Sequence, residues 1–153
     1  MKTLLFIIIL CTQIQSCEDI AADKDFPLYV KNQSSHSIKV FFNDDDNHLA
    51  IYPDTLISSV QDGIIEILNG EKEAVAGGSA PWESVFKVTV PNDTLSLFIF
   101  HSDTINRYTW SQIREDYNIL KRYDLSLEDL ELLDFEVPYP PTLEMEDMRM
   151  YPR

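Results

Sequence analysis

The chain has 153 residues, a length that fits one compact domain. Apolar residues make up 44% and charged residues 25%, an ordinary balance for a folded protein that argues against a disordered chain. Acidic residues outnumber basic ones 26 to 12, and the resulting formal charge of −14 excludes nucleic acid as a partner because it repels phosphate backbones.

Residues 1–16 are predicted to be a secretory signal peptide. Lys2 supplies a short positive region, and an uninterrupted apolar run extends from Leu4 to Leu10. This run is too short to cross a hydrocarbon core of about 30 Å as a helix, which needs roughly 20 residues. The segment therefore indicates export of the protein.

The signal ends in Ile14-Gln15-Ser16-Cys17, with a branched apolar residue at −3, a small residue at −1 and cysteine at +1. This pattern resembles the lipobox of bacterial lipoproteins, whose cysteine is diacylglycerylated before cleavage and acylated on its new amino terminus afterwards. One acyl chain binds a bilayer marginally, whereas two or three chains hold firmly. We therefore expect Cys17 to be lipidated; the alternative is an ordinary secretory signal with a chance cysteine.

Residues 17–25 are expected to form the lipidated cysteine and an acidic tether, followed by a single globular domain over residues 26–153. Glu18 and Asp19 resemble the export signals that carry Bacteroidetes lipoproteins to the cell exterior. The resemblance implies an outer-membrane lipoprotein that faces the exterior. The alternatives are a domain that faces the periplasm, retention at the inner membrane, and a merely soluble tether.

The first part of the domain carries strand patterns. Residues 28–31 and 38–42 alternate apolar and polar side chains around a group of turn residues, which predicts a hairpin. Residues 64–68 predict another strand that ends at the turn dipeptide Asn69-Gly70.

Two further strands are expected in the middle of the chain. Residues 86–90 alternate Phe, Val and Val with Lys and Thr up to a Pro-Asn-Asp turn, which predicts a strand. Residues 95–100 are apolar on both faces, with leucine and isoleucine on one side and phenylalanine on the other. Such a strand is usually central and covered on both sides.

The final third mixes helical and strand signals. Thr109 with Gln112 fits a capping box and predicts a short helix through Tyr117, and Ser126 begins a second short helix. Residues 119–123 predict a strand between these helices.

Prolines limit the regular structure near the C-terminus. Pro138, Pro140 and Pro141 forbid a regular central strand, and the tail to Arg153 is expected to be irregular or frayed. Short strands separated by Gly, Pro, Asn and Asp turns favour a mainly β fold, an antiparallel β-sandwich with one or two short helices in the C-terminal third. The alternative is an α+β fold.

Several motifs resemble small uncharacterised lipoproteins of Bacteroidetes. They are the lipobox, residues 93–100, Trp110 with Tyr117, residues 123–126, Tyr139-Pro140-Pro141 and Met150-Tyr151-Pro152. The resemblance implies a compartment, the bacterial envelope, and it implies no particular activity.

Asp44, Asp46 and His48 stand in an acidic loop and are the candidate metal ligands. Calcium takes six to eight oxygen ligands, and alternate carboxylates on a loop supply several of them. The EF-hand pattern is absent, because no glycine occupies the sixth position of the loop. The alternative to a calcium site is a solvated charged turn.

Nucleophilic chemistry has little support in the sequence. No Gly-x-Ser-x-Gly elbow is present, and His101, Ser102 and Asp103 are neighbours that would point to opposite faces of a strand. We therefore expect no catalytic residues. The alternative is a small metal-dependent or carboxylate-based hydrolase acting on glycans or peptides, since 26 acidic residues offer many carboxylate pairs.

Tyr108, Trp110 and Tyr117 are candidate binding residues because exposed aromatic rings stack on sugars or anchor partner proteins. The alternative is that these rings pack a helix onto the sheet.

Thr55, Thr94 and Thr104 are candidate glycosylation sites. Each follows aspartate and precedes an aliphatic residue, a pattern that resembles the O-glycosylation acceptor of exported Bacteroidetes proteins. All three are expected where a turn meets a strand; the alternative is ordinary turn residues.

A lipid anchor without an identifiable nucleophile, metal cage or cofactor loop predicts a non-catalytic envelope domain that acts in recognition, assembly or scaffolding. The expected partners are the membrane, through the anchor, and a protein or glycan of the envelope.

Overall fold

The structure is a computed structural model that describes residues 25–43 and 63–152. The strands in these ranges are β1 (Leu28–Asn32), β2 (Ile38–Asn43), β3 (Ile65–Ile67), β4 (Lys72–Ala76), β5 (Leu95–His101), β6 (Lys121–Leu125), β7 (Glu136–Tyr139) and β8 (Arg149–Tyr151). The helices are α1 (Trp82–Val88), α2 (Ser102–Arg107), α3 (Trp110–Glu115) and α4 (Leu127–Leu132), with 3-10 turns η1 (Pro91–Asp93) and η2 (Leu143–Met145). The predicted mainly β fold is confirmed.

The described strands form two sheets that share one hydrophobic core. Their orders are β4-β1-β7 and β3-β2-β5-β6-β8, and every neighbouring pair is antiparallel except β1 and β7. The core contains Leu28 and Val30 from the smaller sheet together with Leu97 and Ile99 from the larger one. Alternate residues of each strand thus meet in the space between the sheets, as in a sandwich.

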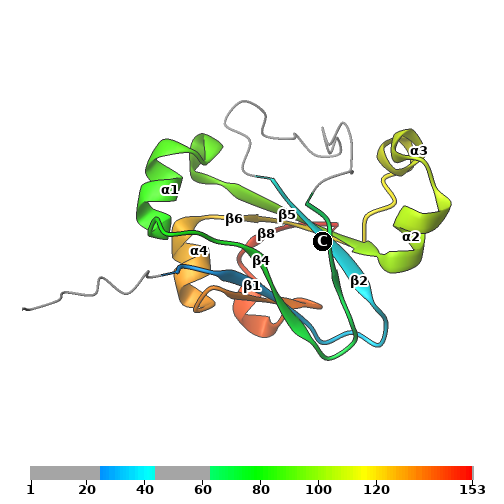
Figure 1. Cartoon of the computed structure of the whole chain (residues 1–153), viewed down its shortest axis with the longest axis horizontal. Helices are drawn as coiled ribbons and strands as arrows, with labels where there is room; N and C mark the ends of the chain where they lie inside the picture. The colour runs from blue at the N-terminus through cyan, green and yellow to red at the C-terminus, as the bar shows by residue number, and fades with distance from the viewer. Residues whose placement is uncertain (1–24, 44–62, 153) are drawn as a thin grey trace, which may run out of the picture.

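Strand β5 is central, as its sequence predicts. It pairs with β2 on one side and β6 on the other. Leu95, Leu97 and Ile99 lie in the main core, whereas Phe98 and Phe100 form a second cluster with residues of α3 and the loop after it. Figure 1 shows α2 and α3 at one end of the molecule and α1 and α4 at the other.

The expected hairpin over residues 28–42 is wrong, because β1 and β2 belong to different sheets. The buried side chain of Asn32 explains the crossing. Its amide nitrogen donates to the carbonyl oxygens of His36 (2.8 Å) and Ile67 (3.1 Å), and its Oδ1 accepts from the backbone N–H of Ser34 (3.0 Å). These bonds hold a corner between the two sheets in place of a hairpin turn.

The strand expected over residues 86–90 is also wrong, because most of this segment belongs to helix α1. Trp82 and Phe86, four residues apart, are both buried on the same helical face, whereas Val88 is 79% exposed. Glu83 in the first turn and Lys87 in the last turn suit the helix dipole. Apolar and polar residues alternate over residues 86–90 by chance. The four-residue spacing of buried side chains that is typical of a helix becomes visible only when Trp82 is included.

The predicted capping box at Thr109 is confirmed, and the helix predicted to begin after Ser126 also has a capping box. Thr109 and Gln112 cap α3, and Ser126 and Asp129 cap α4, each pair with both reciprocal hydrogen bonds. Helix α3 ends at Glu115 and does not reach Tyr117, whose φ of +49° lies in the left-handed region.

The C-terminal tail differs from the irregular or frayed segment that the prolines suggest. Strand β7 lies at the edge of the smaller sheet, where its proline is tolerated, but the tail then forms β8, which pairs with β6. Met145 and Met148 are buried in the main core. Burial of these two side chains anchors the tail despite its acidic composition.

Candidate functional site

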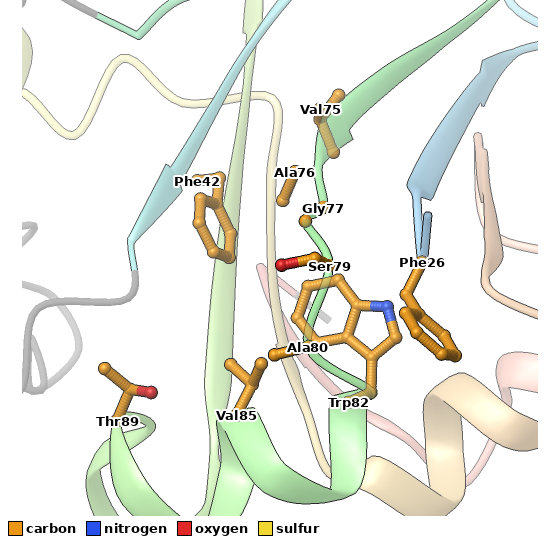
Figure 2. Close-up of a pocket in the computed structure, with 11 residues that line it drawn as sticks. Phe26, Phe42, Val75, Ala76, Gly77, Ser79, Ala80, Trp82, Val85 and Thr89 are labelled. Carbon is orange, nitrogen blue, oxygen red and sulfur yellow. The ribbon is translucent and has the colours of Figure 1, made fainter. Parts of the chain in front are cut away.

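Two hollow surfaces in the described residues lie beside α1. We define the first hollow as the space of about 390 Å³ between Phe26, Phe42, Val75, Trp82 and Val85 (Figure 2). The last residue of β4 and the connection to α1, residues 76–80, also line it. The lining of the first hollow is therefore largely apolar, and it includes the exposed backbone of Gly77 and Gly78.

A second hollow adjoins the first. It measures about 600 Å³ and is lined by Phe26, Tyr29, Trp82 and Phe135, with Pro27 and Pro81 beside them. Its acidic lining residues are Asp25, Glu83 and Asp134. Phe26 and Trp82 line both hollows, so we call the two hollows together the α1 groove.

Backbone contacts between three segments shape the α1 groove. Phe26 N–H donates to the carbonyl oxygen of Gly78 (3.0 Å), and Tyr29 N–H donates to that of Phe135 (2.9 Å). Gly77 has a φ of +150°, and a Cβ at this position would lie 2.9 Å from Cα of Pro27. Glycine is required here because two backbones approach closely.

Aromatic stacking fixes the shared wall of the groove. The rings of Trp82 and Phe135 stack with centroids 6.2 Å apart and planes 19° apart, and Phe86 meets Trp82 edge-on at 6.4 Å. Asp134 and Phe135 both have positive φ angles, 50° and 56°, which turn the chain sharply after α4. This turn is uncommon for a bulky residue, and it directs the ring of Phe135 to Trp82.

The indole N–H of Trp82 is the unusual polar group of the groove. Trp82 is only 5% exposed, and its Nε1 has no hydrogen-bond partner in the described part of the chain. Figure 2 shows this nitrogen on the side of the ring that faces Phe26. An unpaired buried donor costs about 1–3 kcal/mol, so a bound acceptor would recover part of that free energy.

Charged residues next to the groove are arranged around Glu136. Its carboxylate lies 2.7 Å from Nζ of Lys72 and 3.5 Å from Nζ of Lys31. The hydrogen bond from Lys72 lowers the pKa of Glu136, and the same hydrogen bond raises the pKa of Lys72. Nζ of Lys72 also lies 4.8 Å from the ring centroid of Tyr29, at the border of the second hollow.

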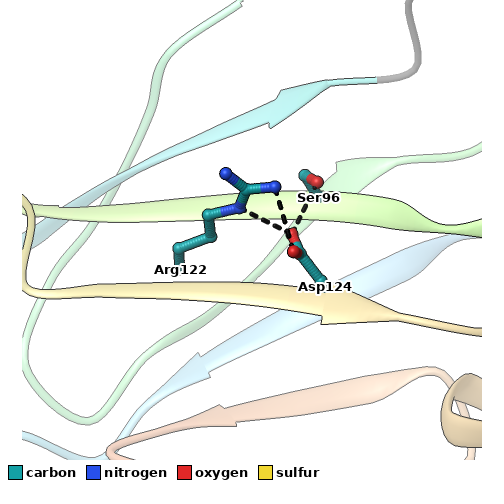
Figure 3. Close-up of polar contacts among 3 residues, drawn as sticks. All are labelled: Ser96, Arg122 and Asp124. Carbon is teal, nitrogen blue, oxygen red and sulfur yellow. Dashed lines mark hydrogen bonds and ion pairs between the residues drawn. The ribbon is translucent and has the colours of Figure 1, made fainter. Parts of the chain in front are cut away.

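A buried polar network between β5 and β6 is a second candidate site (Figure 3). Asp124 accepts hydrogen bonds from Oγ of Ser96 (2.7 Å) and from Nε (2.7 Å) and Nη2 (2.9 Å) of Arg122. The three residues are 1–5% exposed. Because the carboxylate accepts three hydrogen bonds and the network is closed to solvent, we assign it a structural role.

The structure leaves several sequence-predicted residues outside its described ranges. These are Cys17, Asp44, Asp46, His48 and Thr55. Within the described ranges, no group of three or more His, Cys, Asp and Glu side chains is placed to hold a metal ion.

The two threonines that the structure describes have different settings. Thr94 immediately precedes β5, as expected, and its Oγ1 donates to the carbonyl oxygen of Asn92 (3.1 Å). Thr104 lies inside α2, so its expected position before a strand is wrong. Helix α2 begins at Ser102, before Thr104, because His101 caps it: Nδ1 of His101 accepts a hydrogen bond from the N–H of Asp103 (3.1 Å).

The three aromatic candidates do not share one environment. Trp110 packs against Phe100 with ring centroids 5.6 Å apart, and Tyr117 is a partly buried neighbour of the second cluster. Tyr108 is 47% exposed. Their role in binding stays a prediction.

Sequence reasoning missed the α1 groove, because it expected a strand where α1 forms. The signal that was present is the spacing of Trp82 and Phe86 after Pro81, which suits the first turns of a helix. No pattern in the sequence brings Phe135, from the far end of the chain, to this tryptophan.

Comparisons with known proteins found no protein-family model, curated protein or solved structure that matches this chain. In the described residues, no helix combines the length and the apolar character that a bilayer crossing requires.

Proposed function

We propose that this chain is a lipid-anchored, non-catalytic recognition domain of the bacterial outer envelope, and that it binds a partner protein through the α1 groove. The observation that carries the proposal is the shared wall of Trp82 and Phe26 between two hollows. Concave surfaces with aromatic walls and few polar groups are the usual form of a binding site.

The geometry of the groove favours binding over catalysis. Its walls are aromatic and aliphatic, and its acidic side chains lie at exposed positions. The described histidines take part in packing elsewhere: the rings of His36 and His101 stack at 4.5 Å, and His101 also caps α2. Neither histidine lines the α1 groove.

The proposed anchor is Cys17, within the lipobox Ile14-Gln15-Ser16-Cys17. A diacylglyceryl group with an additional amide-linked chain would hold the domain at the membrane. We propose external display, because Glu18 and Asp19 follow the cysteine directly, with a periplasm-facing domain as the alternative.

A photo-crosslinking residue placed in the groove tests the proposed function. Ser79 is exposed and lines the first hollow, whereas Ser111 is exposed on α3 at the other end of the molecule. We expect benzoylphenylalanine at position 79 to give one discrete protein adduct in the producing cells, and position 111 to give none. Equal adducts from both positions, or none from position 79, would contradict the proposal, as would turnover of a glycan or peptide substrate.

We also propose O-linked sugar at Thr55, Thr94 and Thr104. The intact mass of protein from its native host should exceed that of the lipidated polypeptide and fall stepwise in Thr→Ala variants. Thr94 is half-buried immediately before β5 and Thr104 is half-buried in α2, so we propose Thr55 as the first site to test. A mass equal to that of the lipidated polypeptide alone would remove this proposal.

A further inference from the structure

We infer that the second hollow of the α1 groove binds a lysine or arginine side chain presented by an extended segment of the partner protein. The inference rests on the proposed function, since it names the chemistry of the partner at the same groove. Three features of the hollow support it: its charge, its aromatic walls and the unpaired indole N–H.

The charge of the hollow is acidic. Asp25 precedes β1, Glu83 lies in the first turn of α1, and Asp134 follows α4, so three separate segments each place an acidic residue in the lining of the same hollow. No lysine or arginine is among the described residues that line it. Carboxylates around a concave apolar surface favour a cationic ligand over a neutral or anionic one.

The aromatic walls suit the same ligand. A cation within about 6 Å of a ring centroid is attracted by the electrons of the ring face, most strongly for tryptophan. Tyr29, Trp82 and Phe135 all line the hollow. Lys72, which shares Glu136 with Lys31, already lies over one ring at 4.8 Å from the centroid of Tyr29, so Trp82 and Phe135 are the rings left for the ligand.

The buried indole N–H of Trp82 faces Phe26, a lining residue of the same hollow (Figure 2), and it favours a ligand that carries a hydrogen-bond acceptor as well as a cation. A peptide segment meets both requirements, because the backbone carbonyl groups next to a lysine or arginine accept hydrogen bonds. A small organic cation without a carbonyl would leave the N–H unpaired. The volume of about 600 Å³ accommodates a long side chain with its adjoining backbone.

Titration of the full chain in mild detergent with blocked pentapeptides tests this inference. The probes are acetyl-Ala-Ala-Xaa-Ala-Ala-amide with arginine, lysine or leucine at the centre, and choline chloride as the free cation. The readout is the indole N–H resonance of Trp82, which is identified by its loss in Trp82→Phe. We expect the arginine and lysine peptides to shift this resonance and to bind at least about fivefold more tightly than the leucine peptide at low salt.

Matched variants assign the effect to the hollow. Glu83→Gln with Asp134→Asn should weaken binding of the arginine peptide by about fivefold, since asparagine tolerates the left-handed backbone at position 134. The control, Glu115→Gln with Asp147→Asn, removes the same charge from exposed positions that line neither hollow, and should leave affinity unchanged. Thermal unfolding of each variant establishes that it folds.

The other outcomes separate this inference from the proposed function. Equal binding of the leucine peptide, or unchanged affinity in the Glu83/Asp134 variant, overturns cation recognition but leaves a peptide-binding groove. Tighter binding of choline than of the peptides replaces the protein segment with a small cation. If no probe moves the Trp82 resonance, cation recognition fails, whereas the crosslinking at position 79 independently decides the proposed function.

Discussion

The buried carboxylate of Asp124 shows how a single residue sets the pairing of two strands. Ionised groups are costly to bury unless charge-assisted hydrogen bonds replace water, and Asp124 has three of them from Ser96 and Arg122. Ser96 and Asp124 stand directly opposite in the β5–β6 register. The Arg122–Asp124 pair lies within β6, but a shift of either strand would break the hydrogen bond from Ser96 of β5 to Asp124, so this bond favours the observed register.

We predict that Asp124→Asn lowers the free energy of unfolding by about 3 kcal/mol or more, because it leaves Arg122 charged and poorly paired in a buried site. The double variant Arg122→Met with Asp124→Leu should cost less than Asp124→Asn alone, since both charges are gone. Urea unfolding measures both. A double variant at least as unstable as Asp124→Asn would contradict the coupling of the two charges.

At the scale of elements, α1 shows that a short alternating pattern does not determine secondary structure. Residues 86–90 suit a strand, but Trp82 and Phe86 bury more apolar surface by facing the core from one side of a helix. Val88 is then left at an exposed position, where its branched side chain lowers helix propensity.

We predict that Val88→Ala raises the free energy of unfolding by about 0.5 kcal/mol, because alanine is the better helix former at an exposed site. In a strand the same change would be destabilising, since β-branched residues are favoured there. Urea unfolding at neutral pH gives the sign. The exposed Val88→Gly variant serves as the control and should lose stability.

The two sheets are linked by a side chain as well as by the core. Tyr123 of β6 donates its hydroxyl to the carbonyl oxygen of Pro138 in β7 (3.0 Å), and Tyr139 lies in the same core. Burial raises the pKa of Tyr123 well above its usual 10.0, and the charge of Tyr139 raises it further. Only the neutral phenol is compatible with this buried position.

We predict that the stability of the fold falls as the pH rises above about 10, because the unfolded chain releases the Tyr123 proton before the folded one does. Below that pH the stabilisation is fully present. Tyr123→Phe should cost about 1 kcal/mol at pH 7 through the lost hydrogen bond, yet make stability less dependent on pH between about 9 and 11. Urea unfolding between about pH 9 and 11 measures this dependence. If the free energy of unfolding changes with pH as steeply in the variant as in the original protein, the assignment to Tyr123 is contradicted.

At the scale of the whole molecule, the two ends differ in character. Helices α2 and α3 at one end cover Phe98 and Phe100, whereas α1 at the other end adjoins the α1 groove (Figure 1). The domain as described begins at Asp25, which itself lines the second hollow. The proposed tether, residues 17–25, would thus join the domain beside the groove.

We predict that Cys17→Ala moves the protein from the membrane fraction to the soluble fraction and abolishes labelling by radioactive palmitate. The thiol is the proposed acyl acceptor, so no lipid can be attached without it. Ser16→Ala, which keeps a small residue at −1, is the control and should stay in the membrane. Membrane retention of the Cys17→Ala variant would contradict the anchor.

The sequence by itself determined the elements whose signals are local. The capping boxes at Thr109 and Ser126 act within one helical turn, and the doubly apolar run over residues 95–100 has no stable position except the middle of a covered sheet. The strand predicted over residues 64–68 forms as the shorter β3 (Ile65–Ile67), and the turn at Asn69-Gly70 follows it, since this dipeptide favours a turn in any context.

Only the tertiary structure decided which strands pair and where a groove forms. Local alternation is the same for a hairpin and for two strands in separate sheets. The contacts at the corner between the sheets are long-range, such as the hydrogen bond from Asn32 to Ile67, 35 residues away. The groove needs Trp82, Phe26 and Phe135 together, from segments that only the β1–β7 and β1–β4 pairings bring close. Long-range contacts of this kind carry no short-range pattern, because their free energy arises from surfaces that meet after the chain has folded.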